Sequence, residues 1–464
     1  MAVRLITGPA GSGKTGRALR IFKQFSTMEH EQSVRFLVPT VSQCDGLRRL
    51  LLSDHKFPGF LGDPVCTFFR FAGDVLADAR VPRRRLISDV QKRLILQEIV
   101  QNSAEGFFAG VMDSPNFTEA LGSAIDALKL AAATPEDLLS AAKSAKGLSQ
   151  SSLQKIRDFA SLYAGYQEEL VRHNLHDREG LMWRAFLAAQ GQASLLDKYK
   201  LVVLDGFLGL TPVQKGFIKL LAERCENLVI TLDWEEERPQ VFSGVEQDFN
   251  FLMGLPGVRR EHLPRHPERQ GISLGHMEQY LFCKNAKKQE PDGRIITLAG
   301  ADPDSEVELV AQTILKLVRK EGYEYGDFGI VTRGADSYRR RIKSVFKRSS
   351  IPFSEGKRPL AESPLARALV LSLKVVEEGW QREHVLPLLK SGYLSLDMES
   401  CIKIETACAG GGRKAGRDAW FSPWRPHDPS LDDRKSALAS VLEFERALKF
   451  ADWDGGLAAV ERLF

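Results

Sequence analysis

The stretch Val3-Arg4-Leu5-Ile6-Thr7-Gly8-Pro9-Ala10-Gly11-Ser12-Gly13-Lys14-Thr15 decides how the first part of this chain folds. Its apolar beginning predicts a buried strand, and the residues after Lys14 place apolar side chains at helical spacing (Ala18, Leu19, Phe22 and Phe25). The glycines between them allow backbone N–H groups to turn toward phosphate oxygens at the start of the helix. The sequence therefore predicts a P-loop that binds ATP or a close relative.

The residues of this loop have separate expected roles. Lys14 is expected to neutralise the β and γ phosphates of ATP, and Thr15 is expected to hold Mg²⁺. Asp205, which closes the apolar strand 201–204, is the candidate second ligand of Mg²⁺, so Lys14 and Asp205 are the candidate catalytic residues. The backbone of Gly8, Pro9, Ala10, Gly11, Ser12 and Gly13 completes the expected nucleotide site. The alternatives are a chance glycine-rich turn and an aspartate that merely begins a loop.

The chain has 464 residues, too many for one hydrophobic core, and its pattern divides into several regions. Strand 34–38, strand 201–205 and strand 228–232, with a helix over 212–224, join the first strand in an α/β domain built from residues 1–80 and 198–234. Helical periodicity, as over 89–100 and 153–173, predicts a helical insertion at 81–197. Residues 235–293 are expected to be an irregular connection with one helix at 276–283.

A second α/β pattern follows the connection. Strands at 294–298 and 328–332 and helices at 305–320 and 338–348 predict the start of a second domain over residues 294–364. Residues 365–464 are predicted to be a second helical insertion, interrupted by a flexible glycine-rich loop at 409–416. The fold class is α/β, and we expect the sequence to be a fragment of a longer protein because it ends at Phe464 within a helical pattern.

Composition limits the classes of function. Apolar residues make up 43% of the chain without a run near the roughly 20 residues of a membrane-spanning helix, so no membrane partner is expected. The first strand begins too early for a signal peptide, which predicts a cytoplasmic protein. Six cysteines without CxxC spacing predict neither a zinc site nor a disulfide framework. The net charge of +4 includes basic clusters at 83–85 and 339–348, which either neutralise phosphates or form solvated surfaces.

Other motifs give no support to competing chemistries. His262 and His266 are four residues apart, but Pro264 between them is incompatible with a helical metal site. Pro291-Asp292 is interpreted as a turn, and no G-x-S-x-G motif supports acyl transfer. The sequence has neither the Asn/Thr-Lys-x-Asp motif of GTPases nor the Leu-Ser-Gly-Gly-Gln type of signature of transporter ATPases. A motor-like or helicase-like protein, or a nucleotide-dependent binding subunit, remains.

Several segments, in order, resemble superfamily 1 helicases of the UvrD type and, more closely, the AddB-type subunit of the bacterial AddAB helicase-nuclease. Leu37-Val38-Pro39-Thr40 and Val65-Cys66-Thr67-Phe68-Phe69-Arg70-Phe71-Ala72 are similar to motifs that follow the P-loop in that family. Val203-Leu204-Asp205-Gly206-Phe207 with Thr211-Pro212-Val213-Gln214 is similar to its Walker B region. Further similar segments are 328–333, 351–353, 363–365 and 388–392. The resemblance spans nearly all of this chain but only the N-terminal part of the family's full length.

The resemblance implies two RecA-like motor domains, each with a helical insertion, in an ATP-binding and DNA-binding subunit. Such a subunit partners an AddA-like helicase-nuclease and holds single-stranded DNA or duplex ends during repair of double-strand breaks. Gly206 and Leu208 replace the Glu and Gln of an active motor, and this predicts weak or no ATP turnover. One alternative is an active ATPase that translocates on single-stranded DNA, and another is a nucleic-acid scaffold with a vestigial P-loop.

Overall fold

The structure is a computed structural model. It describes residues 2–26, 33–55, 57, 59–60, 62–103, 106–112, 114–145, 147–283, 285–333, 335–354, 360, 363–394, 396–411, 416–422, 435 and 438–450. The chain divides into two compact units, Met1–Thr297 and Leu298–Phe464, each of which is described by itself.

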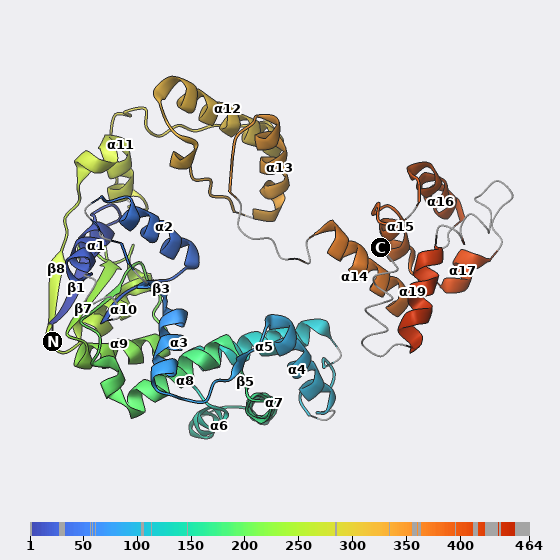
Figure 1. The fold of residues 1–464 in the computed structure, drawn as a ribbon, viewed down its shortest axis with the longest axis horizontal. Helices are drawn as coiled ribbons and strands as arrows, with labels where there is room; N and C mark the ends of the chain where they lie inside the picture. The colour runs from blue at the N-terminus through green and yellow to red at the C-terminus, as the bar shows by residue number, and fades with distance from the viewer. Residues whose placement is uncertain are drawn as a thin grey trace. The chain divides into compact units, whose positions relative to one another are not determined.

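A six-stranded parallel sheet forms the centre of the first unit (Figure 1). The strands lie in the order β3-β2-β6-β7-β1-β8, and every neighbouring pair is parallel. Their bounds are β1 Ala2–Gly8, β2 Val34–Val38, β3 Val65–Thr67, β6 Leu201–Leu204, β7 Asn227–Asp233 and β8 Val258–His262. The predicted α/β class and the four strands predicted for the first domain are thereby confirmed.

Helices cover both faces of this sheet, which explains why its central strands are continuous apolar runs. Successive side chains of a strand point to opposite faces, so Leu5 belongs to one core and Ile6 to the other. The core with Ile6 includes α1 (Lys14–Phe25) and α2 (Val41–Leu52). The core with Leu5 includes α3 (Phe68–Asp78), α8 (Arg178–Gly191), α9 (Pro212–Arg224) and α10 (Glu246–Met253).

The region between β3 and β6 is helical, as the periodicity predicts. It contains α4 (Asp89–Gln101), α5 (Pro115–Leu130), α6 (Pro135–Ser144), α7 (Gln150–Arg172) and then α8. A separate core, with Leu96 and Tyr163 among its buried side chains, joins α4, α5 and α7. The short strands β4 (Arg85–Leu86) and β5 (Leu175–His176) pair in parallel where the chain enters and leaves this helical group. The sequence pattern did not predict this strand pair.

The prediction of an irregular connection at 235–293 is wrong in part. This region holds the short 3₁₀ helix η3 (Ser243–Val245), α10, the edge strand β8 and α11, which spans Pro267–Tyr280 rather than 276–283. Strand β8 has the sequence Val-Arg-Arg-Glu-His and its side chains are partly or fully exposed. Charged residues are typical of edge strands, and they removed the apolar alternation by which a strand is recognised.

The second unit is helical throughout its described part. Its helices are η4 (Tyr325–Asp327, 3₁₀), α12 (Pro303–Glu321), α13 (Ala335–Arg348), α14 (Pro364–Glu377), α15 (Arg382–Leu389), α16 (Met398–Gly411), α17 (Arg417–Phe421) and α19 (Ala439–Phe450). Helices were predicted at 305–320 and 338–348, and α12 and α13 confirm them.

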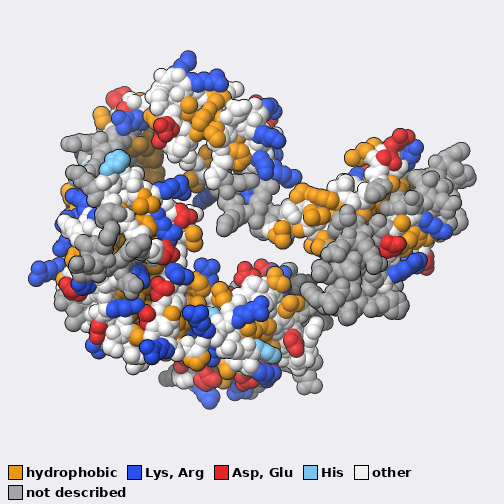
Figure 2. Space-filling view, in the orientation of Figure 1, with side chains coloured by type: hydrophobic (Ala, Val, Ile, Leu, Met, Phe, Trp, Pro, Cys, Tyr) orange, Lys and Arg blue, Asp and Glu red, His pale blue; other side chains and the backbone are white. Residues whose placement is uncertain are grey.

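The strands predicted at 294–298 and 328–332 do not form in the described part of the second unit. A strand needs a neighbouring strand to accept its backbone hydrogen bonds, and these apolar segments have none there. Val331 is 97% exposed as a result. Figure 2 shows hydrophobic side chains gathered over α12 and α13, where a cavity of about 710 Å³ is lined by Phe328, Ile330 and Phe346 among others. Residues 412–415 of the predicted glycine-rich loop and the chain end at 451–464 lie outside the described residues.

The face of the molecule drawn in Figure 2 intersperses lysine and arginine side chains with aspartate and glutamate. Within the described parts of the chain, no helix has both the length and the apolar character that crossing a bilayer requires.

Candidate functional site

The glycine-rich loop of residues 8–13 connects the end of β1 to the start of α1. Gly13 is the N-cap of α1 and has φ +88°, a left-handed conformation that favours glycine over residues with a side chain. The Ser12 N–H donates to the Pro9 carbonyl at 3.2 Å, which closes the turn. The first N–H groups of α1 have no carbonyl partner within the helix, and the helix dipole adds partial positive charge there. This loop therefore presents a terminus suited to an anion.

Lys14 is the first residue of α1, and its side chain folds back over the loop. Its Nζ donates to the carbonyls of Gly8 at 3.0 Å and Pro9 at 2.7 Å. The same Nζ forms an ion pair with Asp233 Oδ1 at 2.5 Å, at the end of β7. Asp233 is about half exposed, whereas Lys14 is nearly buried. The ammonium therefore has a partner that solvent can reach and that an incoming anion can replace.

Asp205 follows β6 and lies next to the start of α1. The Thr15 hydroxyl donates to both of its carboxylate oxygens, at 2.9 and 3.1 Å, and the Thr231 hydroxyl donates to Oδ1 at 2.7 Å. Asp205 is 6% exposed. Burial raises the pKa of Asp205 above the ordinary aspartate value, against the two hydroxyl hydrogen bonds and the charge of Lys14. Among the described residues Asp205 forms no ion pair.

The structure thus brings together the three residues that the sequence singled out, Lys14, Thr15 and Asp205. A carboxylate and a hydroxyl are oxygen ligands of the kind that Mg²⁺ prefers, and an ammonium beside a helix N-terminus suits phosphate. Sequence reasoning missed Thr231 and Asp233 as members of this site. Their signal was available, because parallel strands end at one edge of a sheet and β7 lies between β1 and β6.

No carboxylate directly follows Asp205. Gly206 has φ +76°, and its N–H donates to the Thr231 hydroxyl at 3.2 Å. A Cβ built at Gly206 would meet only Gln43 Nε2 at 3.8 Å and Pro39 Cδ at 4.0 Å. Leu208 is 67% exposed. The position therefore has room for a side chain, although its backbone conformation disfavours one.

The two histidines at 262 and 266 do not share a helix. His262 ends β8 and lies within hydrogen-bond distance of the Thr7 hydroxyl, 3.2 Å from its Nδ1. Arg260 donates to the same hydroxyl at 3.0 Å, and Arg17 forms an ion pair with Glu261 at 2.8 Å. These contacts attach β8 to β1 and α1 beside the glycine-rich loop. The cluster is thus part of the support of the loop.

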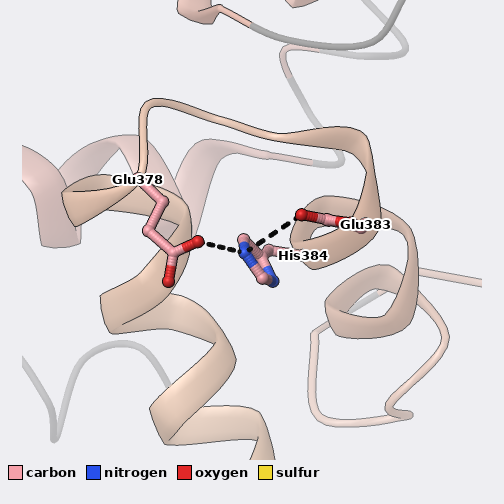
Figure 3. Close-up of side chains that lie close together, drawn as sticks. All are labelled: Glu378, Glu383 and His384. Carbon is pink, nitrogen blue, oxygen red and sulfur yellow. Dashed lines mark hydrogen bonds and ion pairs between the residues drawn. The ribbon is translucent and has the colours of Figure 1, made fainter. Parts of the chain in front are cut away.

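Two groups of side chains outside this site have ligand atoms close together. In the second unit, Glu378 at the end of α14 and His384 of α15 point toward each other at 2.7 Å, with Glu383 3.9 Å from the imidazole (Figure 3). The hydrogen bond from His384 lowers the pKa of Glu378. Both glutamates are exposed to solvent, and an ion pair with the histidine explains the arrangement. The other group, in the first unit, is Asp126, Asp177 and Glu179, in which lysines neutralise the two aspartates.

Comparisons with known proteins give a consistent family. The family model described as "ADDB, N-terminal" matches residues 5–253. The chain is 27% identical to an ATP-dependent helicase/deoxyribonuclease subunit of Acetivibrio thermocellus, over 95% of this chain and 40% of the relative. It is 26% identical to the protein of the same name in Pelotomaculum thermopropionicum, over 96% of this chain and 42% of the relative. The chain thus spans about two fifths of the length of the curated relatives it matches. It belongs to the AddB N-terminal family.

Proposed function

We propose that this chain is the ATP-binding and DNA-binding part of a helicase-nuclease subunit that processes double-strand breaks for recombinational repair. The relatives' names supply the helicase-nuclease context. The observation on which the nucleotide site depends is the hydrogen bond between Thr15 and Asp205, residues 190 positions apart. The proposed partners are DNA, as single strands or duplex ends, and an AddA-like helicase-nuclease subunit.

The residues at the glycine-rich loop fit Mg²⁺-ATP. Asp205 is a buried carboxylate whose ionised form is disfavoured, and a divalent cation would supply the missing positive charge. Thr15 and Asp205 would hold Mg²⁺, while Lys14 and the N–H groups of the loop would hold the β and γ phosphates. The bound cation would neutralise charge on the phosphates. In this proposal the anion replaces Asp233 as the partner of Lys14.

The finer fold assignment is also part of the proposal. A glycine-rich loop after β1, with β7 and β6 beside it in the sheet, is the arrangement expected of a P-loop RecA-like domain of the UvrD-like superfamily 1 type. The parallel order places Asp205 and Thr231 at the same edge as the loop. This supports the first motor domain, whereas residues 294–364 stay a proposal for the start of the second.

We further propose that ATP turnover by this chain is weak. A general base contributes roughly 10² to 10⁴ in rate, and Gly206 has no carboxylate to orient or activate water. Lys14, Thr15 and Asp205 would bind and orient the nucleotide. Holding ATP without fast hydrolysis suits a subunit that stabilises DNA ends while its partner moves along the strand.

The test is equilibrium binding of Mg²⁺-ATP together with steady-state hydrolysis on single-stranded DNA. Lys14→Ala should weaken ATP binding by roughly 10- to 100-fold, because charge-assisted hydrogen bonds contribute about 1.5 to 3 kcal/mol each. Hydrolysis by the unmodified chain should stay below about 1 s⁻¹, the lower end of ordinary enzyme rates. Gly206→Glu should raise hydrolysis relative to Gly206→Ala, which carries the same backbone strain without the carboxylate.

The outcomes separate the alternatives. Turnover above about 1 s⁻¹ that disappears in Lys14→Ala would contradict the proposal and favour an active translocating ATPase. A failure to bind Mg²⁺-ATP at equilibrium would instead favour a nucleic-acid scaffold with a vestigial loop.

A further inference from the structure

A cavity of about 510 Å³ lies at the root of the helical insertion, on the first unit. The C-terminal half of α3, the segment 80–84 that leads into β4, His176 of β5 and the first turns of α8 line it. The chain enters and leaves the insertion beside this cavity, since β4 and β5 pair there. The proposed ATP site uses none of these residues.

The charged side chains of this root cavity are predominantly basic. Arg80, Arg83, Arg84 and Arg184 line it, and within the described part of the chain none of these four forms an ion pair. Arg184 donates one hydrogen bond, to the Pro82 carbonyl at 3.2 Å. The acidic residue of the lining is Asp74, which Arg35 and Arg70 already neutralise at 3.7 and 3.4 Å. The cavity therefore has an excess of positive charge that this part of the protein leaves uncompensated.

His176 adds an independent sign of a missing ligand. Its side chain lines the same cavity, the residue is 7% exposed, and its Nδ1 has no hydrogen-bond partner among the described residues. A buried polar atom without a partner costs about 1 to 3 kcal/mol in general, so such atoms are uncommon. Burial lowers the pKa of Arg184, and the Arg84 guanidinium lowers it further. The two arginines thus lie close enough to repel each other.

We propose that the root cavity binds a phosphate group of a nucleic-acid strand, held by Arg84, Arg184 and His176. Guanidinium groups match phosphate oxygens with paired hydrogen bonds, and an anion between the two arginines would remove their repulsion. Val81, Pro82 and Leu181 give the cavity an apolar wall that could contact the sugar. The assignment of the phosphate to a strand rests on the proposed DNA binding. A free phosphate ligand shares the same chemistry, and the experiment distinguishes the two sources.

The first measurement is anisotropy of a fluorescein-labelled single-stranded oligonucleotide over a series of salt concentrations, with the whole 464-residue chain. Arg84→Gln combined with Arg184→Gln should weaken binding about tenfold or more and reduce the salt slope by about one to two. Arg93→Gln combined with Arg172→Gln is the control, because it removes the same charge from exposed positions on α4 and α7. The control should change affinity less than about twofold.

The second measurement is thermal stability with pyrophosphate in the Lys14→Ala background, which removes phosphate binding at the glycine-rich loop. Pyrophosphate should raise the melting temperature of the chain with both cavity arginines and leave that of the Arg84→Gln, Arg184→Gln variant unchanged. Without ligand, the variant should melt no lower than the parent, since it loses a repulsion. A merely structural role of the arginines predicts a lower melting temperature.

The outcomes assign or reject the site. An oligonucleotide affinity loss no larger than in the control would overturn the assignment to a nucleic-acid strand, and a pyrophosphate effect that persists with it would assign the cavity to a free phosphate. Absence of both effects would overturn phosphate binding altogether. If the unmodified chain binds no oligonucleotide, the proposed function and the strand assignment both fail, while the pyrophosphate measurement still decides phosphate binding by the cavity.

Discussion

Two buried aspartates of the first unit differ in how their charge is compensated. Asp177, the N-cap of α8, pairs with the buried Lys129 at 2.6 Å and accepts hydrogen bonds from Tyr166 at 2.9 Å and the Gly180 N–H at 2.8 Å. Burial opposes its ionisation, yet the ammonium and these donors hold the pKa of Asp177 below the ordinary value. Asp205 has two hydroxyl donors and no ion-pair partner among the described residues, and burial raises its pKa.

The difference separates a structural carboxylate from one that is available for a ligand. The Lys129–Asp177 pair is internally compensated, and it joins α5 to α8 at the base of the insertion. Asp205 is positioned by Thr15 and Thr231 but left without a cation, as expected where a metal ion completes the site. Similar burial therefore accompanies opposite shifts in pKa, and the neighbouring charge decides the direction.

The largest effect is expected where the compensation is complete. Lys129→Met would leave the Asp177 carboxylate buried beside an apolar side chain, which costs about 3 to 5 kcal/mol of unfolding free energy. Chemical denaturation monitored by circular dichroism measures this loss. Lys129→Met combined with Asp177→Asn should recover most of it, because the amide keeps the cap and no charge remains. A loss below about 1 kcal/mol in Lys129→Met would show that the pair is not compensated as described.

A smaller and opposite effect is expected at the uncompensated carboxylate. Asp205→Asn should leave the melting temperature at neutral pH unchanged or higher, since it removes a buried charge and keeps an acceptor for Thr15 and Thr231. The Mg²⁺-dependent part of ATP affinity should fall about tenfold, the equivalent of one charge-assisted contact of about 1.5 kcal/mol. Titrations of ATP with and without Mg²⁺ measure this part. Retention of the Mg²⁺ effect would remove Asp205 from the proposed site.

How far sequence reasoning reached depends on whether a feature is local. The glycine-rich loop, Lys14 and Thr15 are contiguous, and Asp205 ends an apolar strand, so a motif was enough to find them. Asp233 and Thr231 depend on the strand order, which brings β7 between β1 and β6. Lys129 and Asp177 are 48 positions apart, and no periodicity links them. Strand prediction failed for β8, whose charged residues form an edge strand, and for 328–332, whose apolar residues have no strand beside them.

The two carboxylates should also give opposite pH dependences of stability. The pKa of Asp177 is lowered by folding, so its stabilisation is present above the unfolded aspartate pKa and is lost as pH falls through the folded value. The pKa of Asp205 is raised, so its contribution is most favourable below the unfolded pKa and is lost as pH rises through the folded value. The cost of Asp177→Asn should therefore shrink from pH 7 to pH 3, while any gain from Asp205→Asn should grow from pH 3 to pH 7. Unfolding free energies of both variants across this range test the signs, and equal slopes would contradict them.

The smallest effect concerns the partner that Lys14 has in the absence of a nucleotide. Asp233 is about half exposed, and ion pairs of exposed groups contribute about 0.2 to 1 kcal/mol. If ATP replaces this carboxylate, Asp233→Asn should tighten ATP binding by up to about fivefold, since the nucleotide no longer competes with a charge for the ammonium. The carbonyls of Gly8 and Pro9 would still orient Lys14. Calorimetric titration of ATP into Asp233→Asn and into Asp54→Asn, which removes a comparable exposed pair with Lys23, measures the difference. Weaker ATP binding in Asp233→Asn than in this control would mean that Asp233 belongs to the nucleotide-bound site and is not displaced by the phosphates.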